Sequence, residues 1–167
     1  MNKAYNVLIL CTGNSARSVM AEGLFNMLGK GRFKAYSAGS QPTGKVNPFA
    51  VEILAKNGYD ASGVRSKSWD EFAQPDAPEM DFIFTVCDNA AGEVCPVWVG
   101  HPSTGHWGFS DPAAIEGSDD AKREAFSLVY RQIARRIELF MNLPLEKLDR
   151  QAIKHHIDAI GSEMPAV

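Results

Sequence analysis

The segment from Cys11 to Ser18 carries the residues best suited to chemistry. It reads Cys-Thr-Gly-Asn-Ser-Ala-Arg-Ser and directly follows the apolar residues 7–10. The backbone N–H groups of such a loop can converge on an oxyanion, and a helix that begins near Ser18 adds the positive end of its dipole. Arg17 supplies a planar guanidinium that can grip two anion oxygens. A strand, this loop and a helix together predict a site for a tetrahedral oxyanion.

The same positive field favours the thiolate of Cys11, which is the nucleophilic form of cysteine. Within the loop, Ser18 can donate to the Cys11 sulfur and Asn14 can hold an unusual backbone conformation, although both residues are also ordinary turn or cap residues. The loop lacks the G-x4-G-K-[S/T] pattern of a nucleotide P-loop. The alternative is a buried cysteine near a surface arginine. The residues expected to bind the oxyanion or support the loop are Thr12, Gly13, Asn14, Ser15, Ala16 and Ser18.

Hydrophobic periodicity indicates the elements that must position this loop. It predicts strands over residues 6–10, 34–37, 82–86 and 97–99, and helices over residues 18–28, 48–56 and 119–141. Pro48 suits a first helical turn, with Asn47 as a candidate cap. Alternating strands and helices predict an α/β domain, a three-layer sandwich whose four-stranded parallel sheet is flanked by helices. Ligands of such sheets bind beyond the carboxyl ends of the strands, where Cys11 lies.

The whole chain is expected to form one domain. Its 167 residues are 45% hydrophobic, which is enough for a proper core. We assign residues 1–143 to a catalytic domain and residues 144–167 to a C-terminal extension, helical over 145–160. Packing of this extension on the same domain is favoured over a dimer contact.

Composition and charge also limit which binding partners and which cellular compartment we expect. A net charge of −3 argues against nucleic acid or an anionic membrane as the main partner. We find no apolar stretch near the roughly 18 residues that span a bilayer, and no secretory signal. The three cysteines are therefore expected to be reduced thiols in the cytoplasm, with a catalytic or redox role.

Residues 11–22, Cys-Thr-Gly-Asn-Ser-Ala-Arg-Ser-Val-Met-Ala-Glu, resemble the signature of the low-molecular-weight protein tyrosine phosphatase family. Further segments resemble its branch of thiol-dependent arsenate reductases, and the resemblance covers residues 6–141. These segments are Tyr36-Ser-Ala-Gly39, Val46-Asn-Pro48, Thr85-Val-Cys87-Asp88 and His106-Trp-Gly-Phe-Ser-Asp-Pro112. The resemblance implies the phosphatase fold and reduction of arsenate for arsenic detoxification.

Cys87 closes the apolar run 82–86. If its strand pairs with the first, Cys11 and Cys87 emerge about 4.8 Å apart, within the roughly 7 Å between Cα atoms that a disulfide allows. The resemblance implies that Cys11 forms a covalent thiol–arsenate adduct and that Cys87 and Cys95 complete a thiol/disulfide relay. A Cys87–Cys95 disulfide would require the segment between them to be looped or to unwind. The alternative is that Cys87 and Cys95 are small core residues.

The resemblance also assigns a general acid and a reductant. Asp111, which precedes Pro112, takes the role of the acid, and a plain Asp-Pro turn is the alternative. The relay needs no bound cofactor, only an external thiol. Cys87 and Cys95 are one residue further apart than in the thioredoxin-coupled members, so thioredoxin and glutathione with glutaredoxin both remain candidates.

Some members of this family hold potassium near the loop. Asn14, Glu22 and Ser37 match three of its ligands, but Lys67 falls near the place of the expected acidic residue. An ammonium group there can replace the cation with its own charge. We therefore expect no required metal.

Two other functions are compatible with the loop. A low-molecular-weight phosphotyrosine phosphatase would share the loop and the acid, but it usually has an aromatic residue directly after Asp-Pro, where this chain has Ala113-Ala114. Such a phosphatase also has no need of Cys87 and Cys95. A noncatalytic oxyanion or redox sensor is the third possibility. Arsenate is the expected substrate, and phosphate or sulfate can occupy the same loop.

Overall fold

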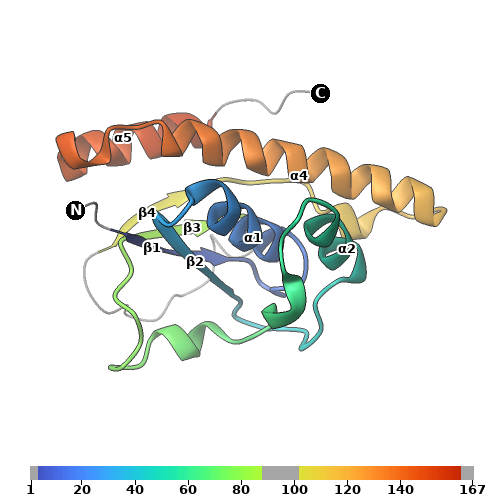
Figure 1. The fold of residues 1–167 in the computed structure, drawn as a ribbon. Helices are drawn as coiled ribbons and strands as arrows, with labels where there is room; N and C mark the ends of the chain where they lie inside the picture. The colour runs from blue at the N-terminus through green and yellow to red at the C-terminus, as the bar shows by residue number, and fades with distance from the viewer. Residues whose placement is uncertain (1–3, 88–101, 163–167) are drawn as a thin grey trace.

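A sheet of four parallel strands forms the centre of the molecule (Figure 1). The structure is a computed structural model that describes residues 4–87 and 102–162. Across the sheet the strands run in the order β2 (Phe33–Ala38), β1 (Tyr5–Leu10), β3 (Phe82–Thr85) and β4 (Ser103–His106). The helices are α1 (Arg17–Gly29), α2 (Pro48–Lys56), α4 (Asp119–Met141) and α5 (Arg150–Gly161). This arrangement confirms the predicted α/β class.

Residues 7–10 of strand β1 are buried on both faces of the sheet, as their uninterrupted apolar sequence requires. Val7 and Ile9 belong to the large core cluster under α1, α4 and α5, whereas Leu8 and Leu10 point to the opposite face of the sheet. There they pack with Trp69 and neighbouring residues of a segment that contains the 3-10 helix Trp69–Phe72. The sheet is therefore the middle of three layers.

Two helices match their predicted bounds because strong local signals fix their ends. Asn47 Oδ1 accepts a hydrogen bond from Phe49 N at 2.9 Å, and Pro48 occupies the first turn of α2. Ser118 Oγ accepts from Ala121 N at 3.1 Å and begins α4. The apolar residues along one face of α4 are all buried: Phe126, Val129, Tyr130, Ile133, Ile137 and Phe140.

The fourth strand differs from the sequence prediction. It is β4, in a segment that the sequence analysis left without an element, and its register pairs Phe82 with Ser103 and Thr85 with His106. The predicted strand over residues 97–99 lies outside the described residues. Because Ser-Thr-Gly-His has no apolar alternation, only its partner β3 reveals this segment as a strand.

The C-terminal segment predicted as one helix over 145–160 is a 3-10 turn, Leu145–Lys147, followed by α5. Asp149 Oδ1 accepts from Ala152 N at 2.7 Å and begins the second piece. Helix α5 packs against β4 and α4. In the described residues, no helix is both long and apolar enough to cross a membrane.

Candidate active site

The loop 11–17 joins β1 to α1 and is held from outside by its carbonyl groups. Thr12 O accepts from Gln41 N at 3.0 Å, and Gly13 O accepts from Thr43 N at 3.1 Å. Ser15 O accepts from the N–H of residue 47 at 2.8 Å. The N–H groups of Cys11, Thr12 and Asn14 donate within the protein, so those of residues 13 and 15–17 are the ones that an anion inside the loop can use.

The start of α1 also offers backbone N–H groups to an anion. Ala16 occupies the cap position and makes no side-chain cap hydrogen bond. The first N–H groups of a helix have no intrahelical partner, so an oxyanion at this point can accept from them and is favoured by the helix dipole. Gly39, at the end of β2, is required for the close approach of the chain here. A Cβ atom on it would collide with the carbonyl oxygens of Cys11 and Thr12.

Asn14 holds the loop in its shape. Its backbone has φ of +46°, in the left-handed region where asparagine is tolerated. The side chain is fully buried and donates to Ser18 Oγ at 2.8 Å and to Ser37 Oγ at 3.0 Å. Its Oδ1 accepts from Lys67 N at 2.9 Å. Asn14 therefore connects the loop to α1, to β2 and to the segment that carries Lys67.

A buried charge pair lies next to Asn14. Ser37 Oγ donates to Glu22 Oε1 at 2.7 Å, and Lys67 Nζ lies 3.9 Å from the same oxygen. Burial raises the pKa of Glu22, against the lowering effects of Ser37 and Lys67. Burial also lowers the pKa of Lys67, while Glu22 opposes this shift. The predicted neighbours of a cation are thus together, and the Lys67 ammonium lies among them.

The two described cysteines meet at the carboxyl ends of adjacent strands. Leu10 pairs with Thr85 in the register of β1 and β3, so Cys11 and Cys87 follow at the same edge of the sheet. Both are buried free thiols, and the Cys87 thiol is close enough to raise the pKa of the Cys11 thiol. Thr12 N also donates to Cys87 Sγ at 3.4 Å. The predicted proximity of the two thiols is therefore confirmed, whereas Cys95 lies outside the described residues.

The protonation of Cys11 differs from the sequence prediction. The hydrogen bond with Cys87 and burial raise the pKa of the Cys11 thiol above its usual range, and the positive charge of Arg17 only partly opposes them. The net shift therefore favours the thiol form of Cys11 over the thiolate. The sequence could not reveal this, because the opposing group comes from a residue 76 positions away.

Arg17 and Asp111 face each other across the mouth of the loop. Arg17 donates to Phe109 O at 2.9 Å and lies 3.7 Å from Asp111 Oδ2. The Asp111 side chain is 44% exposed, and its Oδ1 accepts from Ala113 N at 3.0 Å. The carboxyl group therefore caps the short helix Pro112–Ala114 and also lies beside the Arg17 guanidinium.

Arg136 is a site residue that the sequence analysis missed. It lies on α4, is 5% exposed, and donates to Gly108 O at 3.0 Å. Its guanidinium also lies 4.6 Å from the centre of the Phe109 ring. It therefore fixes the backbone just before Asp111. The available signal was a charged residue on the apolar face of α4, three positions after Ile133.

Cysteine, oxyanion loop and neighbouring carboxyl group can together bind a tetrahedral oxyanion, attack it and protonate a leaving oxygen. The second thiol adds the possibility of thiol–disulfide exchange at the Cys11 sulfur. In the described residues no cluster of three histidine, cysteine, aspartate or glutamate side chains could hold a metal ion.

Comparison with known proteins gives a consistent result. An arsenate reductase from Halalkalibacterium halodurans is 40% identical over 140 residues, which are 84% of this chain and 96% of that protein. One from Bacillus subtilis is 37% identical over 134 residues, 80% of this chain and 93% of that protein. A solved structure of an arsenate reductase in the phosphate binding state has a TM-score of 0.63 and 28% identity, over 82% of this chain and 96% of that one.

The family model for low molecular weight phosphotyrosine protein phosphatase matches residues 6–154. This match includes the loop, both described cysteines and Asp111, and it spans most of the chain. The resemblance predicted from the loop sequence is thereby confirmed. The chain belongs to the low molecular weight phosphotyrosine protein phosphatase family.

Proposed function

We propose that this protein is an arsenate reductase that uses Cys11 as nucleophile and Cys87 and Cys95 as a thiol/disulfide relay. The observation that carries the proposal is the buried Cys87 thiol, which lies at the same edge of the sheet as Cys11 and accepts from Thr12 N at the base of the loop. A phosphatase reaction makes no use of a second thiol at this place. The names of the relatives, arsenate reductase at 34–40% identity, support the same choice.

In the first step Cys11 Sγ bonds to arsenic(V) and one arsenate oxygen leaves as water. Arg17 and the N–H groups of the loop hold the remaining oxygens. Asp111 supplies the proton to the departing oxygen, since it stands 3.7 Å from Arg17 at the open side of the loop. An oxygen of the arsenate anion accepts the Cys11 proton as the sulfur–arsenic bond forms, so the thiol proton stays on the bound arsenate.

In the second step Cys87 Sγ attacks Cys11 Sγ. The sulfur–arsenic bond breaks, its electron pair stays on arsenic, and arsenic(III) leaves as arsenite. Cys95 then attacks Cys87, which frees Cys11 and gives a Cys87–Cys95 disulfide. An external thiol, either thioredoxin or glutathione with glutaredoxin, returns two electrons. The relay requires reduced thiols at rest, so we expect it to work in the cytoplasm.

Two cysteine variants separate the steps of this relay. Cys87→Ser should release no arsenite, even from one equivalent of arsenate, because nothing attacks the adduct. Cys95→Ser should release one equivalent and then stop with thioredoxin as reductant, because the Cys11–Cys87 disulfide still forms. Both variants should hydrolyse para-nitrophenyl phosphate at near wild-type rates. Arsenite is measured by rapid quench, and equal loss of both activities in Cys87→Ser would refute the relay.

The role of Asp111 has its own test. Asp111→Asn keeps the size of the side chain but removes the proton, so the rate of adduct formation should fall by roughly 10²–10⁴-fold. In the wild type this rate should fall as the Asp111 carboxyl group loses its proton. In Asp111→Asn that fall should be absent from the pH profile. Glu116→Gln is a control at an exposed carboxyl group outside the site. A variant Asp111→Asn with an unchanged pH profile would remove Asp111 from the role.

A further inference from the structure

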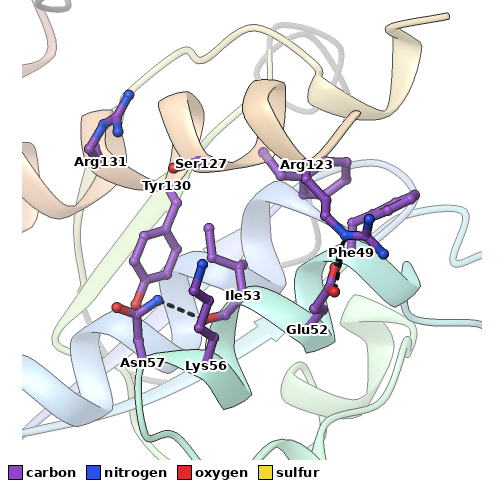
Figure 2. A pocket seen from close by; sticks show the side chains of 10 residues that line it. Phe49, Glu52, Ile53, Lys56, Asn57, Arg123, Ser127, Tyr130 and Arg131 are labelled. Atoms are coloured by element: carbon purple, nitrogen blue, oxygen red, sulfur yellow. Dashed lines mark hydrogen bonds and ion pairs between the residues drawn. The ribbon is translucent and has the colours of Figure 1, made fainter. Parts of the chain in front are cut away.

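A second pocket lies between α2 and α4 (Figure 2). Its volume is about 310 Å³, which is enough for a small organic molecule. None of its lining residues belongs to the loop 11–17 or to the segment around Asp111. The pocket is therefore separate from the oxyanion site, and nothing in the proposed reaction uses it.

The base of the pocket is aromatic and aliphatic. Phe126 and Tyr130 are buried members of the core, and Phe49 and Ile53 pack partly buried against it. The Phe49 and Phe126 rings lie 5.6 Å apart between centroids, at an interplanar angle of 39°. Ring faces and a β-branched side chain in this arrangement favour a flat aromatic body as ligand.

The rim of the pocket is positively charged. Arg123 is paired with Glu52, whose two oxygens lie 3.0 and 3.1 Å from Arg123 Nε. Lys56 and Arg131 also line the pocket. Figure 2 shows Tyr130 between Arg131 on α4 and the α2 end that carries Lys56.

Neither Lys56 nor Arg131 has an ion-pair partner in the described parts of the chain. Arg123 is balanced by Glu52 and, outside the lining, by Asp120 at 3.4 Å, so the positive charge in excess at this pocket comes from Lys56 and Arg131. The chain as a whole has a charge of −3, so the positive character is local. A ligand that is both aromatic and anionic matches both properties of the site.

We propose that the pocket between α2 and α4 binds a small aromatic anion, of the class of the aryl carboxylates. The ring lies against Phe49 and Ile53, and the carboxylate faces Lys56, with Arg131 adding positive charge on the far side of Tyr130. For a ligand of this size at a partly open site we expect a dissociation constant on the order of 1 mM or tighter.

The test is a titration of ¹⁵N-labelled protein with 2-naphthoate, followed through the backbone amide signals. Saturating inorganic phosphate is present throughout, so that the oxyanion loop is not free to take the carboxylate. Saturable shifts on α2 and α4 are expected. The neutral probe 2-naphthylmethanol should bind about fivefold more weakly, because the exposed charges together contribute about 1 kcal/mol.

Variants then test the charges directly. Lys56→Gln with Arg131→Gln should weaken 2-naphthoate about fivefold and leave 2-naphthylmethanol unchanged. The matched control, Lys34→Gln with Lys147→Gln, removes two exposed lysines that do not line the pocket and should change neither affinity. The proposal is overturned by shifts confined to the loop 11–17, by absence of saturation, by equal binding of the two probes, or by equal effects of the two double variants.

Discussion

The Cys87 sulfur governs the protonation of Cys11 in this structure. Arg17 and the loop favour a thiolate, but the hydrogen-bonded neighbouring thiol and burial outweigh them and raise the pKa of Cys11. Two thiols in contact cannot readily both ionise, and the first proton lost belongs to the pair. The second thiol of the proposed relay therefore raises the pKa of the nucleophile, against the effect of Arg17.

Removal of the Cys87 thiol should lower the pKa of Cys11. In Cys87→Ala the largest raising cause is absent and the lowering effect of Arg17 remains. The thiolate fraction of Cys11 at neutral pH then increases, and alkylation by iodoacetamide accelerates with a midpoint at lower pH than in the wild type. The measurement is the pH dependence of labelling of the Cys11 peptide by mass spectrometry.

Cys95→Ser is the control for this experiment, since Cys87 still faces Cys11 in that variant. Its labelling profile should match the wild type. An unchanged midpoint in Cys87→Ala would mean that burial alone sets the pKa of Cys11, and the coupling between the two thiols would then have no role.

The sequence predicted Cys11, Arg17 and Cys87 because each lies in a local pattern: a strand end, a loop of small residues, a helix start. Arg136 and Phe109 were missed because their roles depend on contacts between α4 and a loop that is distant in the sequence. Local patterns locate the nucleophile and the anion-binding groups. They do not locate the side chains that hold the backbone before Asp111.

Lys67 links three parts of the structure. Its N–H donates to Asn14 of the loop, and its ammonium lies beside Glu22 of α1. Glu22 in turn accepts from Ser37 of β2. Its side chain is 8% exposed and that of Glu22 is 12% exposed. Lys67→Met should lower the free energy of unfolding at pH 7 by about 3 kcal/mol, because it leaves a buried carboxylate without its counter-charge. Urea unfolding measures this loss.

The effect of Lys67→Met should depend on pH with a definite sign. Burial already raises the pKa of Glu22 above 4.5, and loss of the Lys67 charge raises it further. The loss of stability is therefore present at neutral pH and shrinks as the pH falls through the pKa of Glu22, where the carboxyl group becomes neutral. Adding Glu22→Gln to Lys67→Met should restore most of the stability at pH 7, and the exposed control Lys147→Met should change little.

Wild-type turnover should be equal in potassium and sodium chloride, because the ammonium of Lys67 already supplies the positive charge beside Glu22. A strong preference for potassium would contradict this assignment, whatever the stability of the variants.

The elements themselves were predictable to different degrees. Helices α2 and α4 carry caps at Asn47 and Ser118, which fix where they begin. Strand β4 carries no such signal, since its polar residues become a strand only by pairing with β3. The start of α5 also has a local signal, the cap residue Asp149, which separates this helix from the 3-10 turn before it. Caps act locally and can be found in a sequence, whereas an edge strand depends on its neighbour.

At the scale of the whole molecule, α5 packs on β4, the strand at one edge of the sheet. Ile157 is fully buried, and its Cγ2 methyl occupies the space where a Cβ atom of Gly105 would lie. Trp107 Nε1 donates to Ile157 O at 3.1 Å, so the same turn of α5 also holds the start of the segment that leads to Asp111. Helix α5 therefore supports the site from the far side of β4.

A double-mutant cycle tests this packing. Ile157→Ala should destabilise by about 3 kcal/mol through the cavity it leaves, and Gly105→Ala by about 2 kcal/mol through overpacking against the Ile157 methyl. In the double variant the new methyl enters the new cavity, so the loss should be smaller than the sum by at least about 1 kcal/mol. Urea unfolding gives the three values.

Gly63→Ala is the control, because nothing lies within 4 Å of a Cβ atom there. Additive losses of stability would mean that α5 does not pack over Gly105 in solution. The inference that α5 supports Trp107 would then fail as well.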